Sequence, residues 1–90
     1  MVNLDLVKAH LRVDGDEQDD LLNHLLVSAQ AECCRYTGLS EDSDVLKQAD
    51  VLNGIILAVQ ADYEGNLEQR AVYLRAAHAL WSPYCVVFGV

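Results

Sequence analysis

Hydrophobic residues recur along this chain at steps of three and four positions, the spacing that places them on one face of an α-helix. The stretch from residue 21 to residue 36 has the longest such pattern. Its apolar positions are Leu21, Leu22, Leu25, Leu26, Ala29, Cys33 and Tyr36. Gly38 comes directly after Thr37, and glycine at this position is typical of a helix end. The pattern therefore predicts a long helix that ends at Thr37.

A shorter helix is predicted before it, over residues 4–13. Asn3 is a good N-cap residue, and Asp5 would lie at the positive end of the helix dipole. The acidic stretch that follows turns at Gly15 and leads into the long helix. We expect Asp16 to cap that helix and Asp19 to take the third position of a capping box, which would explain the acidic stretch locally.

A third helix is indicated by apolar positions in the middle of the chain. These are Leu46, Ala49, Leu52, Ile55, Ile56, Val59 and Tyr63. Residues 39–44 form a short polar loop before it, in which Ser43 or Asp44 can cap the helix. Residues 55–59 are apolar nearly all round, so we expect this helix to lie at the centre of the fold.

Residues 55–59 also allow another interpretation, because their β-branched side chains suit a buried strand. The length of the apolar pattern favours the helix. Gly54 is unfavourable inside a helix by roughly 1 kcal/mol. It therefore either marks a close crossing of two helices or is simply tolerated.

A fourth helix follows a break at Gly65 and Asn66, and Pro83 ends it. Its apolar positions are Leu67, Ala71, Leu74, Ala77 and Trp81. The four segments together predict an all-α fold. We expect a small four-helix bundle-like domain with short loops, in which the second and third helices form an antiparallel centre.

Residues 85–90 form an uncharged apolar tail. We expect a single domain over residues 1–90, with a helical core over residues 1–84 and this tail after it. Terminal segments are ordinarily polar and frayed unless they dock. The tail is therefore expected to pack either on its own domain or on a neighbouring molecule.

The chain is strongly acidic, with a net charge of −8, which opposes a general affinity for nucleic acid. No stretch approaches the ~18 uncharged apolar residues of a membrane span, and the first residues lack the pattern of a signal peptide. We therefore expect a soluble cytosolic protein with no membrane partner. The hydrophobic share of 52% is high for so short a chain, so some apolar surface is expected to meet a partner.

Residue spacing argues against a catalytic or metal site. The acidic stretch that contains Asp14 and Asp16 lacks the glycine and glutamate positions of a calcium loop. The three histidines and three cysteines show no chelating spacing, and no glycine-rich phosphate loop occurs. We expect no metal, no cofactor and no enzyme activity.

Four side chains allow both a structural and a functional interpretation. Lys8 and Arg12 are four positions apart on one face of the predicted first helix. They either form a solvated face or dock onto an acidic partner. Trp81 is expected in the core rather than as a ligand platform. Cys33 is expected to be a buried reduced thiol, since desolvation disfavours its thiolate.

Four short motifs stand in order along the chain. They are residues 4–13 with the acidic turn, Tyr-Thr-Gly at residues 36–38, Tyr-Glu at residues 63–64, and Leu-Trp-Ser-Pro-Tyr at residues 80–84. In this order they resemble the head-tail connector, or adaptor, family of long-tailed bacteriophages, over nearly the whole chain. Two places depart from the family pattern. Cys85 stands where an arginine is common, and no arginine follows Asn66.

The resemblance implies a structural virion protein that is assembled in the host cytoplasm and forms a ring of about a dozen copies in the virion neck. This ring would join the portal protein to a tail-side head-completion or stopper protein, and DNA would pass through it without specific binding. Its acidic inner wall would repel DNA. The candidates for that wall are Asp14, Asp16, Glu17, Asp19, Asp20, Glu41, Asp42 and Asp44. The candidate contacts with a subunit or partner are Lys8, Arg12, Trp81, Tyr84, Cys85, Val86, Val87 and Phe88.

A second function fits the same composition, that of a small acidic helical binding module that regulates a basic partner. Such a regulator would be monomeric or dimeric in solution. A connector would instead form rings, alone or on the portal.

Overall fold

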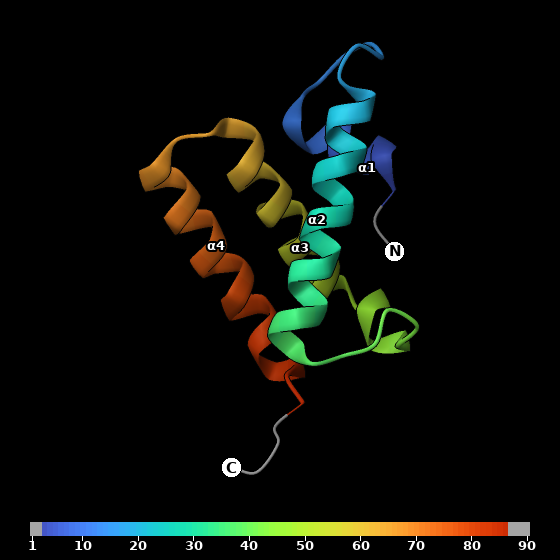
Figure 1. Cartoon of the computed structure of the whole chain (residues 1–90), viewed down its shortest axis with the longest axis vertical. Helices are drawn as coiled ribbons and strands as arrows, with labels where there is room; N and C mark the ends of the chain where they lie inside the picture. The colour runs from blue at the N-terminus through green and yellow to red at the C-terminus, as the bar shows by residue number, and fades with distance from the viewer. Residues whose placement is uncertain (1–2, 87–90) are drawn as a thin grey trace.

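The computed structural model describes residues 3–86, which fold into four α-helices joined by short connections (Figure 1). The elements are α1 (Leu4–Leu11), α2 (Asp19–Thr37), η1 (Asp44–Lys47), α3 (Ala49–Glu64), α4 (Leu67–Trp81) and η2 (Ser82–Tyr84), where η1 and η2 are short 3-10 helices. Residues 55–59 lie within α3, and the described part of the chain contains no strand. The predicted all-α fold is confirmed, and the alternative of a buried strand is wrong.

Residues at the helix ends form the hydrogen bonds that begin or stop each helix. The Asn3 side chain accepts a hydrogen bond from the Leu6 N–H at 2.8 Å, which begins α1 as predicted. Gly38 has a φ of 79°, a left-handed conformation that suits glycine, and its N–H donates to the Cys34 carbonyl at the end of α2. Asn66 caps α4 with its side chain in the same way as Asn3 caps α1.

The first helix is shorter than predicted and ends at Leu11 rather than near Val13. Arg12 has a left-handed conformation with a φ of 58°, and the Val13 N–H donates to the Lys8 carbonyl at 2.9 Å. This reversal of the chain lets Val13 pack against the core. Arg12 therefore lies outside the helix, and the predicted helical face shared by Lys8 and Arg12 is wrong.

The predicted caps of the next two helices are also corrected. The cap residue of α2 is Gln18, whose side chain makes no capping hydrogen bond. The carboxylates of Asp16 and Asp19 bind Lys8 instead. Ser43 caps η1, a separate short helix that comes before α3.

The central helix is α3, as predicted, and it packs against α1, α2 and α4. Its contact with α4 is more extensive than its contact with α2. The antiparallel centre is therefore the α3–α4 hairpin rather than the predicted pair of α2 and α3 (Figure 1).

The closest approach within this hairpin occurs at Gly54. A Cβ atom added to Gly54 would lie 2.3 Å from Trp81 Nε1, which is far inside contact distance. The indole is fully buried, and its N–H donates to the Val51 carbonyl at 3.1 Å. Gly54 therefore marks a close helix crossing, which was one of its two predicted roles.

Two of the predicted apolar stripes are only partly buried. On α2, two residues of the predicted stripe are not buried, since Leu21 is 49% exposed and Tyr36 is 39% exposed. On α4 only Ala77 and Trp81 are buried, whereas Leu67 is 82% exposed. Figure 1 shows the reason, because α4 moves away from α2 toward the α3–α4 turn, and a hollow separates the first half of α4 from α2.

Candidate interaction surfaces

The acidic turn before α2 is held to α1 by Lys8. Lys8 Nζ lies 2.8 Å from Asp19 Oδ1 and 3.4 Å from Asp16 Oδ1, and the Lys8 side chain is only 14% exposed. The hydrogen bond to Asp19 raises the pKa of Lys8 above its ordinary value. Lys8 is thus bound within the chain, which disfavours its predicted role as a docking contact.

Six further acidic residues form two exposed groups, which we call the turn acids and the loop acids. The turn acids are Asp14, Glu17 and Asp20, which form no ion pair with other described residues. The loop acids are Glu41, Asp42 and Asp44. The turn acids come just before α2 or in its first turn, and the loop acids follow its end. Because α2 has 19 residues, the two groups stand about 28 Å apart along its axis.

Aromatic side chains gather where α2 and α4 end together. The rings of Tyr36 and His78 stack with their centroids 4.3 Å apart, and the ring of Trp81 lies 5.7 Å from that of His78. Glu32 Oε1 lies 3.6 Å from His78 Nε2, and a hydrogen bond from Arg35 lowers the pKa of Glu32. Trp81 is fully buried and belongs to the core, so the structure does not offer it as a partner contact.

The segment after α4 folds back on the end of α2. The Val86 N–H donates to the Thr37 carbonyl at 2.7 Å, and Cys85 Sγ lies 3.6 Å from the Tyr36 carbonyl oxygen. Tyr84 is half-buried and packs against the core. The beginning of the predicted tail therefore packs on its own domain and leaves Val86 40% exposed. Two further predicted contacts lie outside the described residues, namely Val87 and Phe88.

Cys33 and Cys34 have environments that suppress their reactivity. Burial raises the pKa of Cys33 to about 12. Burial, together with the charge of Glu41, also raises the pKa of Cys34. The thiolate is the nucleophilic form of cysteine, so both thiols are weak nucleophiles at neutral pH. Across residues 3–86 no three His, Cys, Asp or Glu side chains are grouped in a way that could hold a metal ion.

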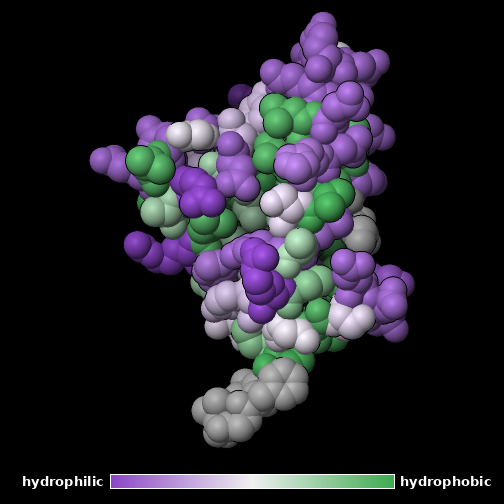
Figure 2. Space-filling model, viewed as in Figure 1, coloured by the Kyte–Doolittle hydropathy of each residue, from purple (hydrophilic) through white to green (hydrophobic). Residues whose placement is uncertain are grey.

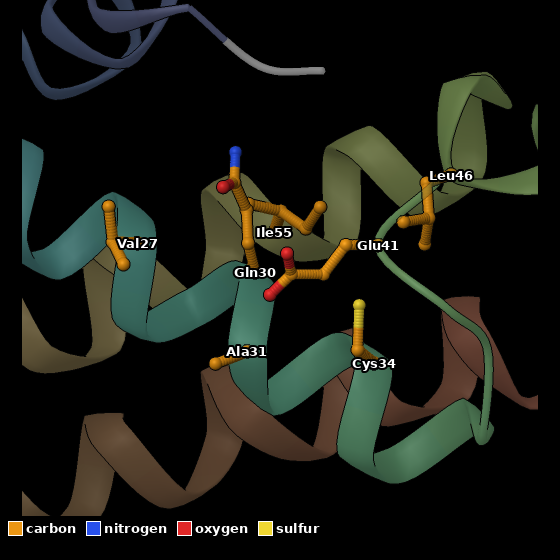
Figure 3. A pocket seen from close by; sticks show the side chains of 7 residues that line it. All are labelled: Val27, Gln30, Ala31, Cys34, Glu41, Leu46 and Ile55. Carbon is orange, nitrogen blue, oxygen red and sulfur yellow. The ribbon is translucent and has the colours of Figure 1, made fainter. Parts of the chain in front are cut away.

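A groove lies between α2, η1 and α3 (Figure 3). We call it the α2–η1 groove, and its volume is about 190 Å³. It is lined by Val27, Gln30, Ala31, Cys34, Glu41, Leu46 and Ile55. Leu46 and Ile55 are buried and supply an apolar floor, whereas Val27 is 65% exposed. In Figure 3 the Glu41 side chain extends from the loop toward Gln30, across the groove.

The sequence carried one signal for this groove. Val27 and Ala31 are apolar and four positions apart, yet they belong to none of the predicted stripes. Val27 and Ala31 form a groove only together with its floor residues, Leu46 from η1 and Ile55 from α3. Periodicity within one helix cannot show that such distant segments meet.

A second hollow of about 180 Å³ lies between α2, α3 and α4, and its four charged side chains are paired with one another. Arg70 Nε lies 3.0 Å from Asp62 Oδ1, and Arg35 binds Glu32.

Arg75 on α4, which was not among the predicted contacts, is exposed and forms no ion pair with other described residues. It is therefore available to a partner.

The outer face of α4 also exposes a hydrophobic side chain. Val72 is 59% exposed on this face, whereas Leu67, which is 82% exposed, belongs to the inward stripe. Figure 2 shows a hydrophobic group among hydrophilic atoms near the tip of the α3–α4 hairpin. Val72 and Arg75 are three positions apart and lie opposite the buried Ala77 and Trp81 around the helix, so this face points away from the core.

The family model described as phage gp6-like head-tail connector protein matches residues 1–78 of the chain. The match spans α1, α2 and α3 and most of α4, and it includes both acidic groups and the α2–η1 groove. No curated protein and no solved structure gives a significant match. In the part of the chain that the structure describes, no helix combines the length and apolarity needed to cross a membrane.

Proposed function

The chain belongs to the phage gp6-like head-tail connector family, and from this premise we propose that its copies form a ring in the neck of the virion. The family match over residues 1–78 is the observation that carries the proposal. Connectors of this family are structural proteins rather than enzymes. The ring would join the portal protein to a tail-side component, such as a head-completion or stopper protein, and DNA would pass through its lumen.

Unlike surfaces on the same subunit support head-to-tail assembly. A ring requires two different surfaces that fit each other when the subunit is repeated about an axis. This chain carries an apolar groove beside α2 and an exposed outer face on α4. A domain of this size buries only about 60–65% of the surface of its unfolded chain, so contact with neighbouring copies would add stability.

The charge distribution supports a channel through which DNA slides. Each copy has a net charge of −8, and this charge multiplies around the ring. The turn acids and loop acids are exposed at the two ends of α2. With α2 running along the channel, the turn acids together with Asp42 and Asp44 would line the wall at two levels and repel the phosphates of the DNA.

The stoichiometry of binding to the portal tests this proposal. The purified protein is mixed with portal rings, and the complex is separated by size exclusion and weighed by light scattering. We expect about a dozen copies of the chain on each portal ring. A protein that stays monomeric beside the portal, but binds a basic protein at equal stoichiometry, would support the acidic regulator instead.

A further inference from the structure

The α2–η1 groove combines an apolar floor with a carboxylate at its mouth. Leu46 and Ile55 are 8% and 2% exposed, and they form the floor. Glu41 is exposed and forms no ion pair with other described residues. Figure 3 shows its carboxylate directed across the groove. A surface that matches this groove would bring an apolar side chain and a cation to the same place.

The outer face of α4 offers this combination. Among the described residues, the exposed leucines at positions 6, 21 and 67 have no unpaired Lys or Arg within four positions. Val72 differs, because Arg75 lies three positions after it on the same side of α4, while Glu68 lies four positions before it. Both side chains are exposed, and Arg75 forms no ion pair with other described residues.

The two surfaces lie on different sides of the molecule. In Figure 1, α4 and η1 flank the middle of the fold, which α2 and α3 occupy. A chain therefore cannot place its own α4 over its own groove while it keeps this fold. A second copy can do so, and contact between unlike faces is the head-to-tail kind that closes into a ring.

We infer that the outer face of α4 of one copy docks over the α2–η1 groove of the next copy. Val72 then lies in the groove beside Cys34, and Arg75 pairs with Glu41. This inference rests on the proposed ring and names the surfaces that close it. Glu68 on the same face of α4 is two turns, or about 10 Å, from Arg75. At that distance salt largely screens its repulsion of Glu41.

Charge reversal tests the contact between Arg75 and Glu41. Arg75→Glu and Glu41→Arg are each expected to raise the protein concentration needed for ring assembly on the portal by about tenfold. The double variant exchanges the two charges and is expected to recover most of the assembly. Asn53→Glu is the matched control, because Asn53 is exposed on α3 and lies neither in the groove nor on α4. It is expected to assemble like the wild type.

Disulfide formation tests the position of Val72. Val72→Cys is made in a Cys85→Ser background and oxidised at alkaline pH, because the pKa of the groove thiol, Cys34, is raised. We expect disulfide-linked dimers and longer ladders on a non-reducing gel. Adding Cys34→Ser is expected to abolish them.

The outcomes separate this inference from the proposed function. The inference would be overturned if both charge-reversed variants assembled on the portal at the wild-type concentration, or if Val72→Cys formed no disulfide with Cys34. In either case the proposed function would stand. Linkage to Cys34 from Phe88→Cys but not from Val72→Cys would overturn it in favour of the apolar tail as occupant. A wild-type protein that forms no ring with the portal would overturn both.

Discussion

Two residues, Gly54 and Trp81, determine how closely α3 and α4 approach each other. The buried indole of Trp81 donates to the Val51 carbonyl and occupies the space that any Cβ at position 54 would need. The sequence indicated a special position, because glycine is unfavourable inside an apolar helix. It did not identify Trp81 as the partner, since that contact depends on how two helices pack.

Gly54→Ala is therefore expected to destabilise the protein by about 1–3 kcal/mol through overpacking. This loss should appear although alanine is the better helix former by about 1 kcal/mol. Urea denaturation followed by circular dichroism measures it. Asn53→Ala is the control, because Asn53 is the exposed neighbour on α3. A Gly54→Ala variant more stable than the wild type would show that the contact with Trp81 is misplaced.

The buried thiol of Cys33 makes the stability of the folded protein depend on pH in the alkaline range. Burial raises the pKa of Cys33 to about 12 from an ordinary value of 9.0, so between these values the folded chain keeps a proton that the unfolded chain loses. The stability from this group is complete below pH 9 and falls as the pH rises toward 12, by at most about 1.4 kcal/mol per pH unit.

Urea denaturation at pH 7 and at pH 10 measures this effect. The loss of stability between the two conditions should be smaller in Cys33→Ala than in the wild type, since other titrating groups are common to both. An equal loss in the two proteins would contradict the burial of this thiol.

At the scale of helices, periodicity located all four α-helices but not the part of each stripe that is buried. Leu67 belongs to the stripe of α4 and Leu21 to that of α2, yet both are exposed. The buried part depends on which neighbour lies beside each turn of helix. Because α4 diverges from α2, the first half of its stripe has no second helix to cover it (Figure 1).

Alanine substitutions on two predicted stripes should therefore differ. Ile56 is 6% exposed, and Ile56→Ala is expected to lower the free energy of unfolding by about 2–5 kcal/mol. Leu21 is 49% exposed, and Leu21→Ala is expected to lower it by less than about 1 kcal/mol. Thermal and urea denaturation of both variants provide the measurement. Similar losses at both positions would show that the α2 face is wrongly assigned.

For the whole molecule, composition predicted the acidic character of the surface but not which charged side chains pair with one another. The turn acids and loop acids are exposed as polar loop residues usually are. The binding of Asp16 and Asp19 to Lys8 was missed, because it joins two helices across a turn. The α2–η1 groove was missed for a similar reason, since three separate elements build it.

Removing charge from the proposed channel wall should make the ring hold DNA. Neutralising the turn acids with Asp14→Asn, Glu17→Gln and Asp20→Asn takes three negative charges from each subunit and so weakens the repulsion of phosphate. Rings of this variant are expected to retard short duplex DNA on a gel at low salt and to release it at high salt. Asp42→Asn with Asp44→Asn is the parallel variant that shows which acidic group faces the lumen, and it leaves Glu41 intact for the contact between copies. Retardation of DNA by wild-type rings would contradict an inert acidic wall.

Electron microscopy of the protein bound to its portal tests the central claim most directly. Negatively stained side views are expected to show an extra layer stacked on the axis of the portal, and end views a closed ring of about a dozen subunits around an open lumen. Portal particles without that layer, at protein concentrations far above those of the portal, would contradict the account.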